Sequence, residues 1–110
     1  MDARFAEVAD QLLLIERELR VRNLWASSPP DAHALASREP FCVDTLSFEE
    51  WLQWIFLPKM KLILEGNQAL PTTSGILAMA EMVYQSDLAQ MSGLLQALKA
   101  FDELIEKSRG

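Results

Sequence analysis

The chain is poor in the residues from which catalytic and metal sites are most often built. Among its 110 residues there is one cysteine, Cys42, and one histidine, His33. A single cysteine cannot form a disulfide within the chain, and a zinc site needs about four His, Cys or carboxylate ligands. The sequence also has no Glu-x-x-His pair, no glycine-rich phosphate loop and no nucleophile signature. We therefore predict that the chain is not an enzyme and has no catalytic residue, cofactor or metal site.

Basic residues and long apolar runs are also scarce. The 10 Lys and Arg residues are outnumbered by 16 Asp and Glu, for a net charge of −6. Since nucleic-acid binding depends on neutralising phosphates, this balance argues against general DNA or RNA binding. Arg17, Arg20 and Arg22 are then either a solvated helix face or a local contact for an anion or RNA. No run approaches the ~20 apolar residues of a membrane span, and the first residues lack a signal peptide's pattern. We expect a cytoplasmic protein without a membrane span.

What the chain does have is helical periodicity. Half of its residues are hydrophobic, and its length suits one domain, which we place at residues 1–110. A three-and-four spacing of apolar residues predicts a first helix over about residues 3–24. Its members are Phe5, Val8, Leu12, Ile15 and Leu19. Ser27-Ser28-Pro29-Pro30-Asp31 ends this pattern, and a loop of about twenty residues follows.

The stretch from Pro40 to Gly66 carries the densest set of signals. Ser47 and Glu50 have the spacing of a capping box, which predicts a helix beginning near Phe48. Pro58 has no N–H for the carbonyl of Trp54, so a kink or break is expected there. Gly66 is expected to end the helix in a left-handed conformation.

The face of this helix is predicted from spacing. Trp51, Ile55, Pro58 and Leu62 recur at four, three and four residues and should share one face, with Gln53 and Lys59 directed to solvent. Cys42, just before this helix, is expected to be a small buried hydrophobe.

Two further helices are expected in the C-terminal half. Thr72, Thr73 or Ser74 would cap a helix with Ile76, Met79, Ala80 and Val83 on one face, and Asp87 would cap a last helix that continues to about Lys107. We therefore predict an all-α fold, a four-helix up-and-down antiparallel bundle with a long loop between the first two helices and a proline kink in the second. The alternative is an orthogonal helical array.

The central helix has more apolar side chains than one face can bury. Trp51 and Trp54 are three residues apart and should project to one side, and the apolar surplus must reach the surface, where such patches are often interaction sites. The pattern does not decide which of Phe56, Leu57 and Met60 are exposed. Our candidate interaction groove comprises Phe41, Asp44, Trp51, Trp54, Phe56, Pro58, Met60 and Glu81.

The same region closely resembles the signature of a known family. The matching elements are Pro40-Phe41, Asp44-Thr45, Glu50-Trp51-Leu52-Gln53-Trp54, Pro58, Met60, Leu70-Pro71 and Glu81-Met82. They resemble the YqcC-like family of small bacterial proteins. The resemblance implies a compact helical domain of uncharacterised activity, connected to tRNA pseudouridine synthases by naming and gene neighbourhood. It supplies no catalytic residues, and a pseudouridine synthase itself is a much larger mixed α/β protein.

Three functions follow in order of preference. The first is a non-enzymatic accessory protein that binds an unknown partner protein, or itself, through the groove. The second is a small-ligand-binding module with Asp44 and Glu81 as polar anchors. The third is an accessory factor in tRNA pseudouridine modification, with the synthase as partner.

Overall fold

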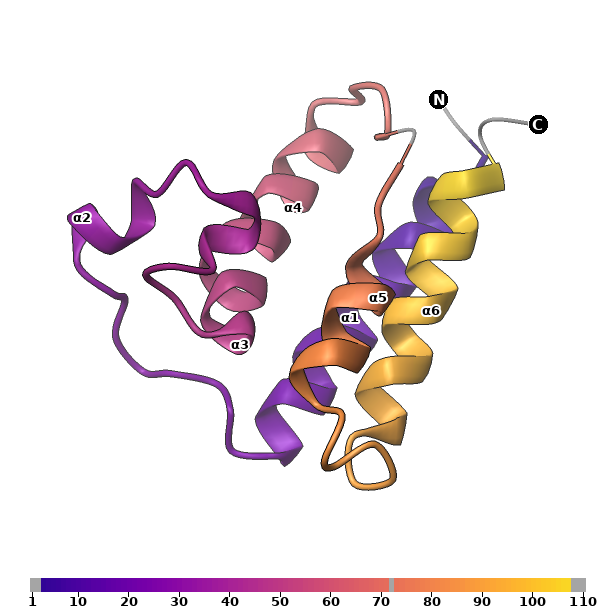
Figure 1. Ribbon diagram of the computed structural model, residues 1–110. Helices are drawn as coiled ribbons and strands as arrows, with labels where there is room; N and C mark the ends of the chain where they lie inside the picture. The colour runs from indigo at the N-terminus through magenta and orange to yellow at the C-terminus, as the bar shows by residue number, and fades with distance from the viewer. Residues whose placement is uncertain (1–2, 72, 108–110) are drawn as a thin grey trace.

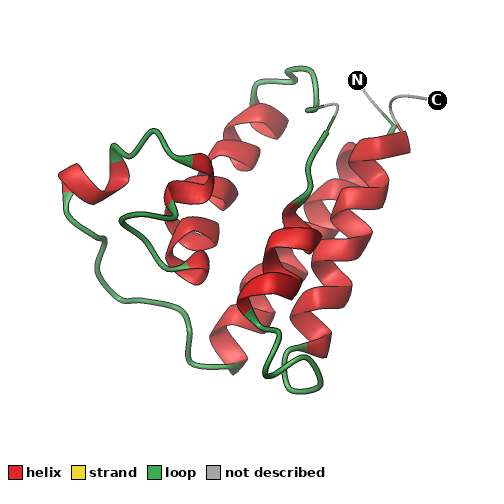
Figure 2. Ribbon diagram, viewed as in Figure 1, coloured by secondary structure: helices red, strands yellow, loops and turns green. Residues whose placement is uncertain are grey.

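The chain folds into helices joined by loops (Figures 1 and 2). The computed structural model describes residues 3–71 and 73–107, and within these there is no strand, which confirms the all-α prediction. The helical segments are α1 (Phe5–Val21), α2 (Ala32–Leu35), the 3₁₀ turn η1 (Pro40–Cys42), α3 (Phe48–Trp51), the π-helical turn η2 (Leu52–Phe56), α4 (Leu57–Glu65), α5 (Ile76–Val83) and α6 (Ser92–Lys107).

The first and last helices form the centre of the molecule. α1 and α6 lie side by side, α5 packs against α6, and α4 contacts α1 (Figure 1). The five residues predicted to form the apolar seam of α1 are all buried. Burying each of these large side chains contributes about 1.5–3 kcal/mol relative to exposure. The α1 seam therefore lies at the centre of the packing with α6 and α4.

Both ends of the α1–α6 pair are also joined by arginines. Arg4 Nη1 donates to the Leu104 carbonyl at 2.7 Å, and Arg22 Nη2 donates to the Gln90 carbonyl at 3.1 Å. Since a helix leaves its last carbonyls unpaired, the Arg4 contact satisfies one of those of α6.

α1 and α4 end in the same way. Asn23 and Asn67 adopt the left-handed conformation, with φ of 60° and 52°. Leu24 N–H then reaches back to the Leu19 carbonyl at 2.9 Å, the long bond of a Schellman motif. α1 is accordingly shorter than predicted, because Asn23 stops it. The prediction for Gly66 was wrong: its φ is −86°, and the left-handed residue is the one after it.

The start of the central helix is the predicted one. Ser47 Oγ accepts from the Glu50 N–H at 3.2 Å, and Glu50 Oε1 accepts from the Ser47 N–H at 2.9 Å. This reciprocal pair confirms the capping box and a helix that begins at Phe48.

Before Pro58 the helix widens instead of breaking. α3, η2 and α4 follow one another with right-handed helical backbone angles, and the Leu57 N–H donates to the Leu52 carbonyl, five residues back. A proline removes the N–H that an α-helix would give to the carbonyl four residues earlier. A π turn is one of the recognised ways in which a helix accommodates such a defect.

The π turn also changes which face is buried. Leu52, Phe56, Leu57 and Met60 are buried, whereas Leu62 is 66% exposed. Of the predicted face, Trp51 and Ile55 are half-buried and Pro58 and Leu62 are exposed, so these four residues do not form the buried face. The reason is that a wider turn rotates the chain less per residue, so a pattern counted at α-helical spacing drifts off the core.

α5 is capped by another helix and not by its own sequence. Asp102 Oδ2, from α6, accepts from the Leu77 N–H at 2.9 Å, and Gly75 occupies the cap position with φ 78°. Neither Thr73 nor Ser74 is the cap residue, and Thr72 lies outside the described residues. A left-handed residue at this position favours glycine.

The last helix begins later than expected. Residues 88–91 form turns, and α6 starts at Ser92 and not near Asp87. Leu88, just after Asp87, is 45% exposed, and Val83 at the end of α5, predicted to share a face with Ile76, is likewise exposed. The Asp87 carbonyl accepts from the Met91 N–H at 3.0 Å, so a single helical turn precedes the helix without joining it.

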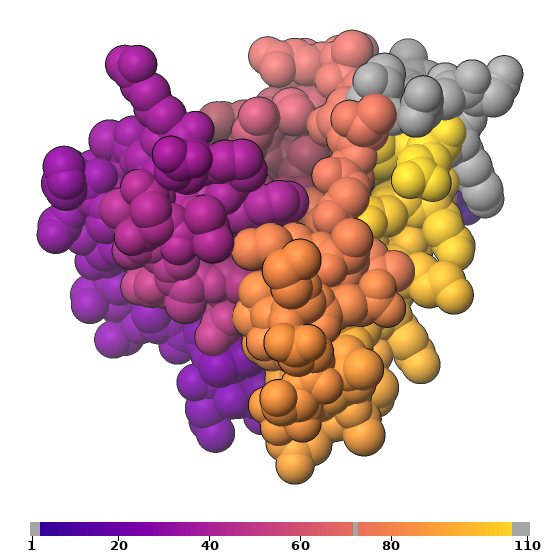
Figure 3. Space-filling view, in the orientation of Figure 1, coloured from indigo at the N-terminus to yellow at the C-terminus, as the bar shows by residue number. Residues whose placement is uncertain are grey.

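One buried cluster draws residues from all the longer helices. The radius of gyration is 13.8 Å, close to the ~13 Å expected for a single folded domain of this length. In the space-filling view, orange α5 and the segment before it run between the purple N-terminal half and yellow α6 (Figure 3). Among the described helices, none combines the length and apolar character needed to cross a membrane.

Candidate functional site

The eight predicted groove residues separate into three places. Phe41, Trp51, Phe56 and Met60 line one hollow, which we call the Trp51 hollow. Trp54 and Pro58 line a second, the Trp54 hollow. Asp44 and Glu81 are exposed and line neither.

The Trp51 hollow is an apolar depression of about 290 Å³. Its floor is a chain of aromatic rings: Phe41 and Trp51 have centroids 4.8 Å apart, Trp51 and Phe56 5.5 Å, and Phe56 and Phe101 4.9 Å. Such pairs add roughly 0.5–1.5 kcal/mol beyond the area they bury. The floor is therefore a continuous aromatic surface built from η1, the central helix and α6.

Three polar residues, Lys59, Thr73 and Ser74, border this apolar floor. The Ser74 hydroxyl is buried and has no hydrogen-bond partner among the described residues, and Lys59 is exposed at the rim. Buried polar atoms are usually paired, so Ser74 is an unused donor and acceptor beside an apolar hollow.

The apolar surplus of the central helix is resolved by burial. Phe56, Leu57 and Met60 are 6%, 1% and 2% exposed, so none of them is a surface contact. Trp51, Trp54 and Ile55 are the half-buried ones. A partner can reach the Trp51 hollow only through its half-buried and exposed rim.

The Trp54 hollow is larger, about 610 Å³, and different in character. It is lined by Arg20 from α1, Trp25 after α1, and Trp54, Pro58 and Lys61 from the central helix. The two tryptophans of the central helix thus face different hollows, contrary to the prediction that they project to one side. The π turn between them explains the divergence.

Sequence reasoning missed Gln53, which it directed to solvent. Gln53 is 5% exposed, its Oε1 accepts from the Ala26 N–H at 2.8 Å, and its Nε2 donates to the Ala26 carbonyl at 2.8 Å. One amide side chain therefore satisfies both backbone groups of a loop residue 27 positions away. No local sequence pattern predicts such a contact, because the partner of the Gln53 side chain is a backbone N–H and carbonyl.

A buried tyrosine joins the other end of the central helix to α5. Tyr84 Oη donates to Glu49 Oε2 at 2.7 Å. Burial raises the pKa of Tyr84 well above its usual value, and the hydrogen bond to the Glu49 carboxylate and that charge raise it further. The group therefore stays protonated and acts as a structural donor.

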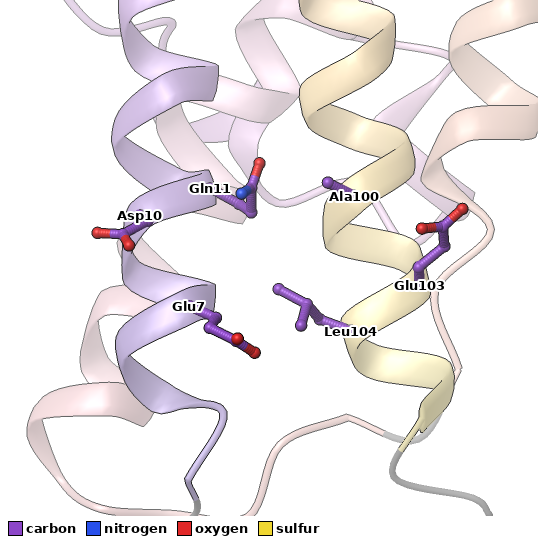
Figure 4. A pocket seen from close by; sticks show the side chains of 6 residues that line it. All are labelled: Glu7, Asp10, Gln11, Ala100, Glu103 and Leu104. Atoms are coloured by element: carbon purple, nitrogen blue, oxygen red, sulfur yellow. The ribbon is translucent and has the colours of Figure 1, made fainter.

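A third depression, between α1 and α6, is acidic. Glu7, Asp10 and Glu103 line it, with a volume of about 250 Å³. The carboxylates of Asp10 and Glu103 point away from each other in Figure 4, and the described residues contain no group of three or more potential ligands that could hold a metal. The arrangement is a solvated helix face.

His33 and Cys42 do not meet. His33 lies in α2 and is exposed, whereas Cys42 is buried as predicted, with Sγ 3.9 Å from the Ser37 carbonyl. Phe41 and Cys42 both have left-handed backbone angles, with φ of 58° and 50°. Such angles cost non-glycine residues roughly 1–3 kcal/mol and persist where packing imposes them.

Comparison with known proteins shows the family. The family model described as "DUF446: tRNA pseudouridine synthase C" matches residues 7–104. An uncharacterised protein of Haemophilus influenzae is 41% identical over 95 residues, which are 86% of each chain. YqcC of Escherichia coli is 34% identical over 94 residues, again 86% of each chain.

A solved structure agrees with the fold. The solution NMR structure of E. coli YqcC matches with a TM-score of 0.83 and 31% identity, covering 96% of this chain and 90% of that one. A protein of Pectobacterium carotovorum named tRNA pseudouridine synthase C is 46% identical over 69 residues, which are 63% of this chain but 18% of that longer protein. Since the family model spans nearly the whole chain and two relatives are covered over most of their length, the chain belongs to the DUF446 family, the YqcC-like proteins.

Proposed function

We propose that this chain is a non-catalytic helical accessory domain that binds a partner protein through the Trp51 hollow. The observation that carries the proposal is the meeting of Phe41, Trp51, Phe56 and Met60 around one apolar depression of about 290 Å³. Protein interfaces derive most of their affinity from a few large side chains that fill such depressions. The strained backbone at Phe41 supports the proposal, because strain tends to persist where it serves a site.

The partner that we propose is a tRNA pseudouridine synthase. The Pectobacterium protein that bears this name resembles our chain over 69 residues and is several times longer. A domain that is fused to a longer protein in one case is often, in another, a separate subunit that binds the rest of that protein. On this proposal the chain docks on a synthase, or on its RNA complex, and itself performs no chemistry.

We also propose an order of the helices and a cellular location. An antiparallel up-and-down order is supported by the alternating directions of α1, the α3–α4 helix, α5 and α6 in Figure 1. A cytoplasmic location would follow from work on tRNA.

The alternative of a small-ligand module is favoured by the unpartnered Ser74 hydroxyl, with Ser74 and Lys59 in the anchoring roles that Asp44 and Glu81 are not placed to fill.

The experiment is a calorimetric titration of the purified chain into the purified synthase of the same host. Ile55→Glu introduces a charge at the rim of the hollow and should weaken binding at least about tenfold. Leu62→Glu makes the same change in the same helix outside the hollow, at a side chain that is already 66% exposed, and should leave affinity unchanged.

Circular dichroism of both variants verifies that they fold. Equal binding of the two variants, or no heat of binding for the wild type, would contradict the proposal. If size-exclusion chromatography instead showed a concentration-dependent dimer that Ile55→Glu abolishes, a second copy of the chain would be the partner.

A further inference from the structure

Trp54 lines the Trp54 hollow, and its side chain carries a buried donor that has no partner among the described residues. The indole Nε1 of Trp54 is buried and has no hydrogen-bond partner among the described residues. A buried, unpaired donor is destabilising, and most native structures avoid it. This nitrogen has no exposed surface, so a ligand in the hollow would meet the exposed part of the Trp54 side chain.

The mouth of the same hollow carries an excess of positive charge. Arg20 Nε lies 2.9 Å from Glu16 Oε2, and Lys61 Nζ lies 3.7 Å from Glu16 Oε1. The Glu16 carboxylate thus faces two cations. Its distance to Lys61 is long, and the Lys61 side chain is half exposed. An anionic ligand could take Lys61 from Glu16 at little cost, because exposed ion pairs contribute little to stability.

The walls are aromatic and held in place. The Arg20 guanidinium sits 4.5 Å from the centroid of the Trp25 ring, which fixes both side chains relative to each other. The Gln53 amide anchors Ala26, the residue after Trp25, through two hydrogen bonds. The loop side of the hollow is therefore preorganised, which reduces the entropy lost on binding.

From these contacts we infer that the Trp54 hollow binds a planar aromatic anion of about the size of a nucleotide. The ring would lie against Trp25 and Trp54, and the anionic group would meet Lys61 and Arg20. A volume of about 610 Å³ is within the usual range of small-molecule sites, roughly 300–1,000 Å³. The inference does not rest on the proposed function, which concerns the Trp51 hollow.

The test uses AMP as probe and the three tryptophan indole N–H signals in ¹H–¹⁵N NMR spectra, assigned with Trp→Phe variants. AMP should shift the signals of Trp25 and Trp54 and leave that of Trp51 in place. Adenosine, which lacks the charge, and ribose 5-phosphate, which lacks the ring, should each bind at least about tenfold more weakly. A short single-stranded RNA that shifts the same two signals at lower concentration than AMP would identify the source of the ligand as nucleic acid, and a weaker effect would identify it as a free nucleotide.

Charge variants separate binding from folding. Lys61→Gln should weaken AMP binding about five- to tenfold, whereas Lys59→Gln, in the same helix and at the rim of the other hollow, should not. Glu16→Gln should tighten binding, because it removes the competing carboxylate, and a purely structural Glu16 would give no such gain. Shifts confined to Trp51, no shift at millimolar AMP, or equal effects of the two lysine variants would overturn the inference.

Discussion

Single buried polar side chains connect parts of this chain that are far apart in sequence. Gln53 holds the start of the long loop through both backbone groups of Ala26, and Tyr84 joins the end of α5 to the first turn of the central helix through Glu49. Each contact is side-chain specific and has an isosteric replacement that removes it. Their contributions can therefore be measured one at a time.

Gln53→Met should destabilise the fold by about 2 kcal/mol. Methionine has nearly the same shape, but it leaves the N–H and carbonyl of half-buried Ala26 without a partner, and such groups are costly to leave unpaired. Urea denaturation measures the free energy of unfolding. Gln85→Met, at an exposed position, is the control and should stay within about 0.5 kcal/mol of the wild type.

Tyr84→Phe should cost about 1 kcal/mol at neutral pH, because the bond to Glu49 is lost. The pKa of Tyr84 is raised in the folded state, so its contribution is fully present below the unfolded value of about 10. Above that pH the unfolded chain ionises first, and the wild type loses up to about 1.4 kcal/mol per pH unit through this group.

The variant lacks this loss, so its deficit should shrink as pH rises from about 9 to about 11. Lysines that titrate in the same range cancel in the comparison of the two proteins. A deficit that stays constant with pH in denaturation experiments would show that Tyr84 ionises normally in the folded state.

At the level of helices, the ends depend on neighbours as much as on local sequence. Ser47 and Glu50, which belong to the central helix's own segment, cap that helix as the spacing predicts. α5 instead receives its cap from Asp102 of α6. Asp102 is 8% exposed, and its other oxygen, Oδ1, has no partner among the described residues. One buried carboxylate of α6 therefore caps α5.

Asp102→Ala should destabilise the fold by about 1–2 kcal/mol, as expected for loss of a helix cap. The first turn of α5 should open locally, so hydrogen exchange at the Leu77 amide should accelerate while amides in the middle of α1 remain protected. Glu103→Ala, at the exposed neighbouring acid, is the control. An unchanged Leu77 exchange rate would contradict a capping role for Asp102.

For the molecule as a whole, α1 and α6 form the firmly packed part, and the segment between α1 and α3 runs along the periphery (Figure 1). Arg38 is exposed in this segment, between α2 and η1, and is the only Lys or Arg from residue 23 to residue 58. Exposed loop positions are the preferred sites of proteolytic cleavage.

Limited trypsin digestion should therefore cut first after Arg38. The two fragments, residues 1–38 and 39–110, should stay together in size-exclusion chromatography, because the buried seam of α1 remains in the core. Mass spectrometry identifies the cut, and Arg38→Gln should slow the first cleavage. Early cleavage at Arg17 or Arg20 would show that α1 opens more easily than the loop.

The sequence by itself determined the helical class, the α1 seam, the capping box at Ser47 and the residues that identify the family. These features are local, since helical periodicity and capping act over one or two turns of chain. Four of the eight predicted groove residues, Phe41, Trp51, Phe56 and Met60, line one depression, and their role in binding stays a prediction.

Only the tertiary structure decided which face of the central helix is buried, which tryptophan faces which hollow, and what Gln53, Tyr84 and Asp102 bind. The π turn before Pro58 shifts the rotation of every residue after it, so α-helical counting assigned the wrong face. The partners of these three polar side chains lie 25 to 35 residues away. Contacts over such separations depend on how the helices pack, and no local pattern encodes them.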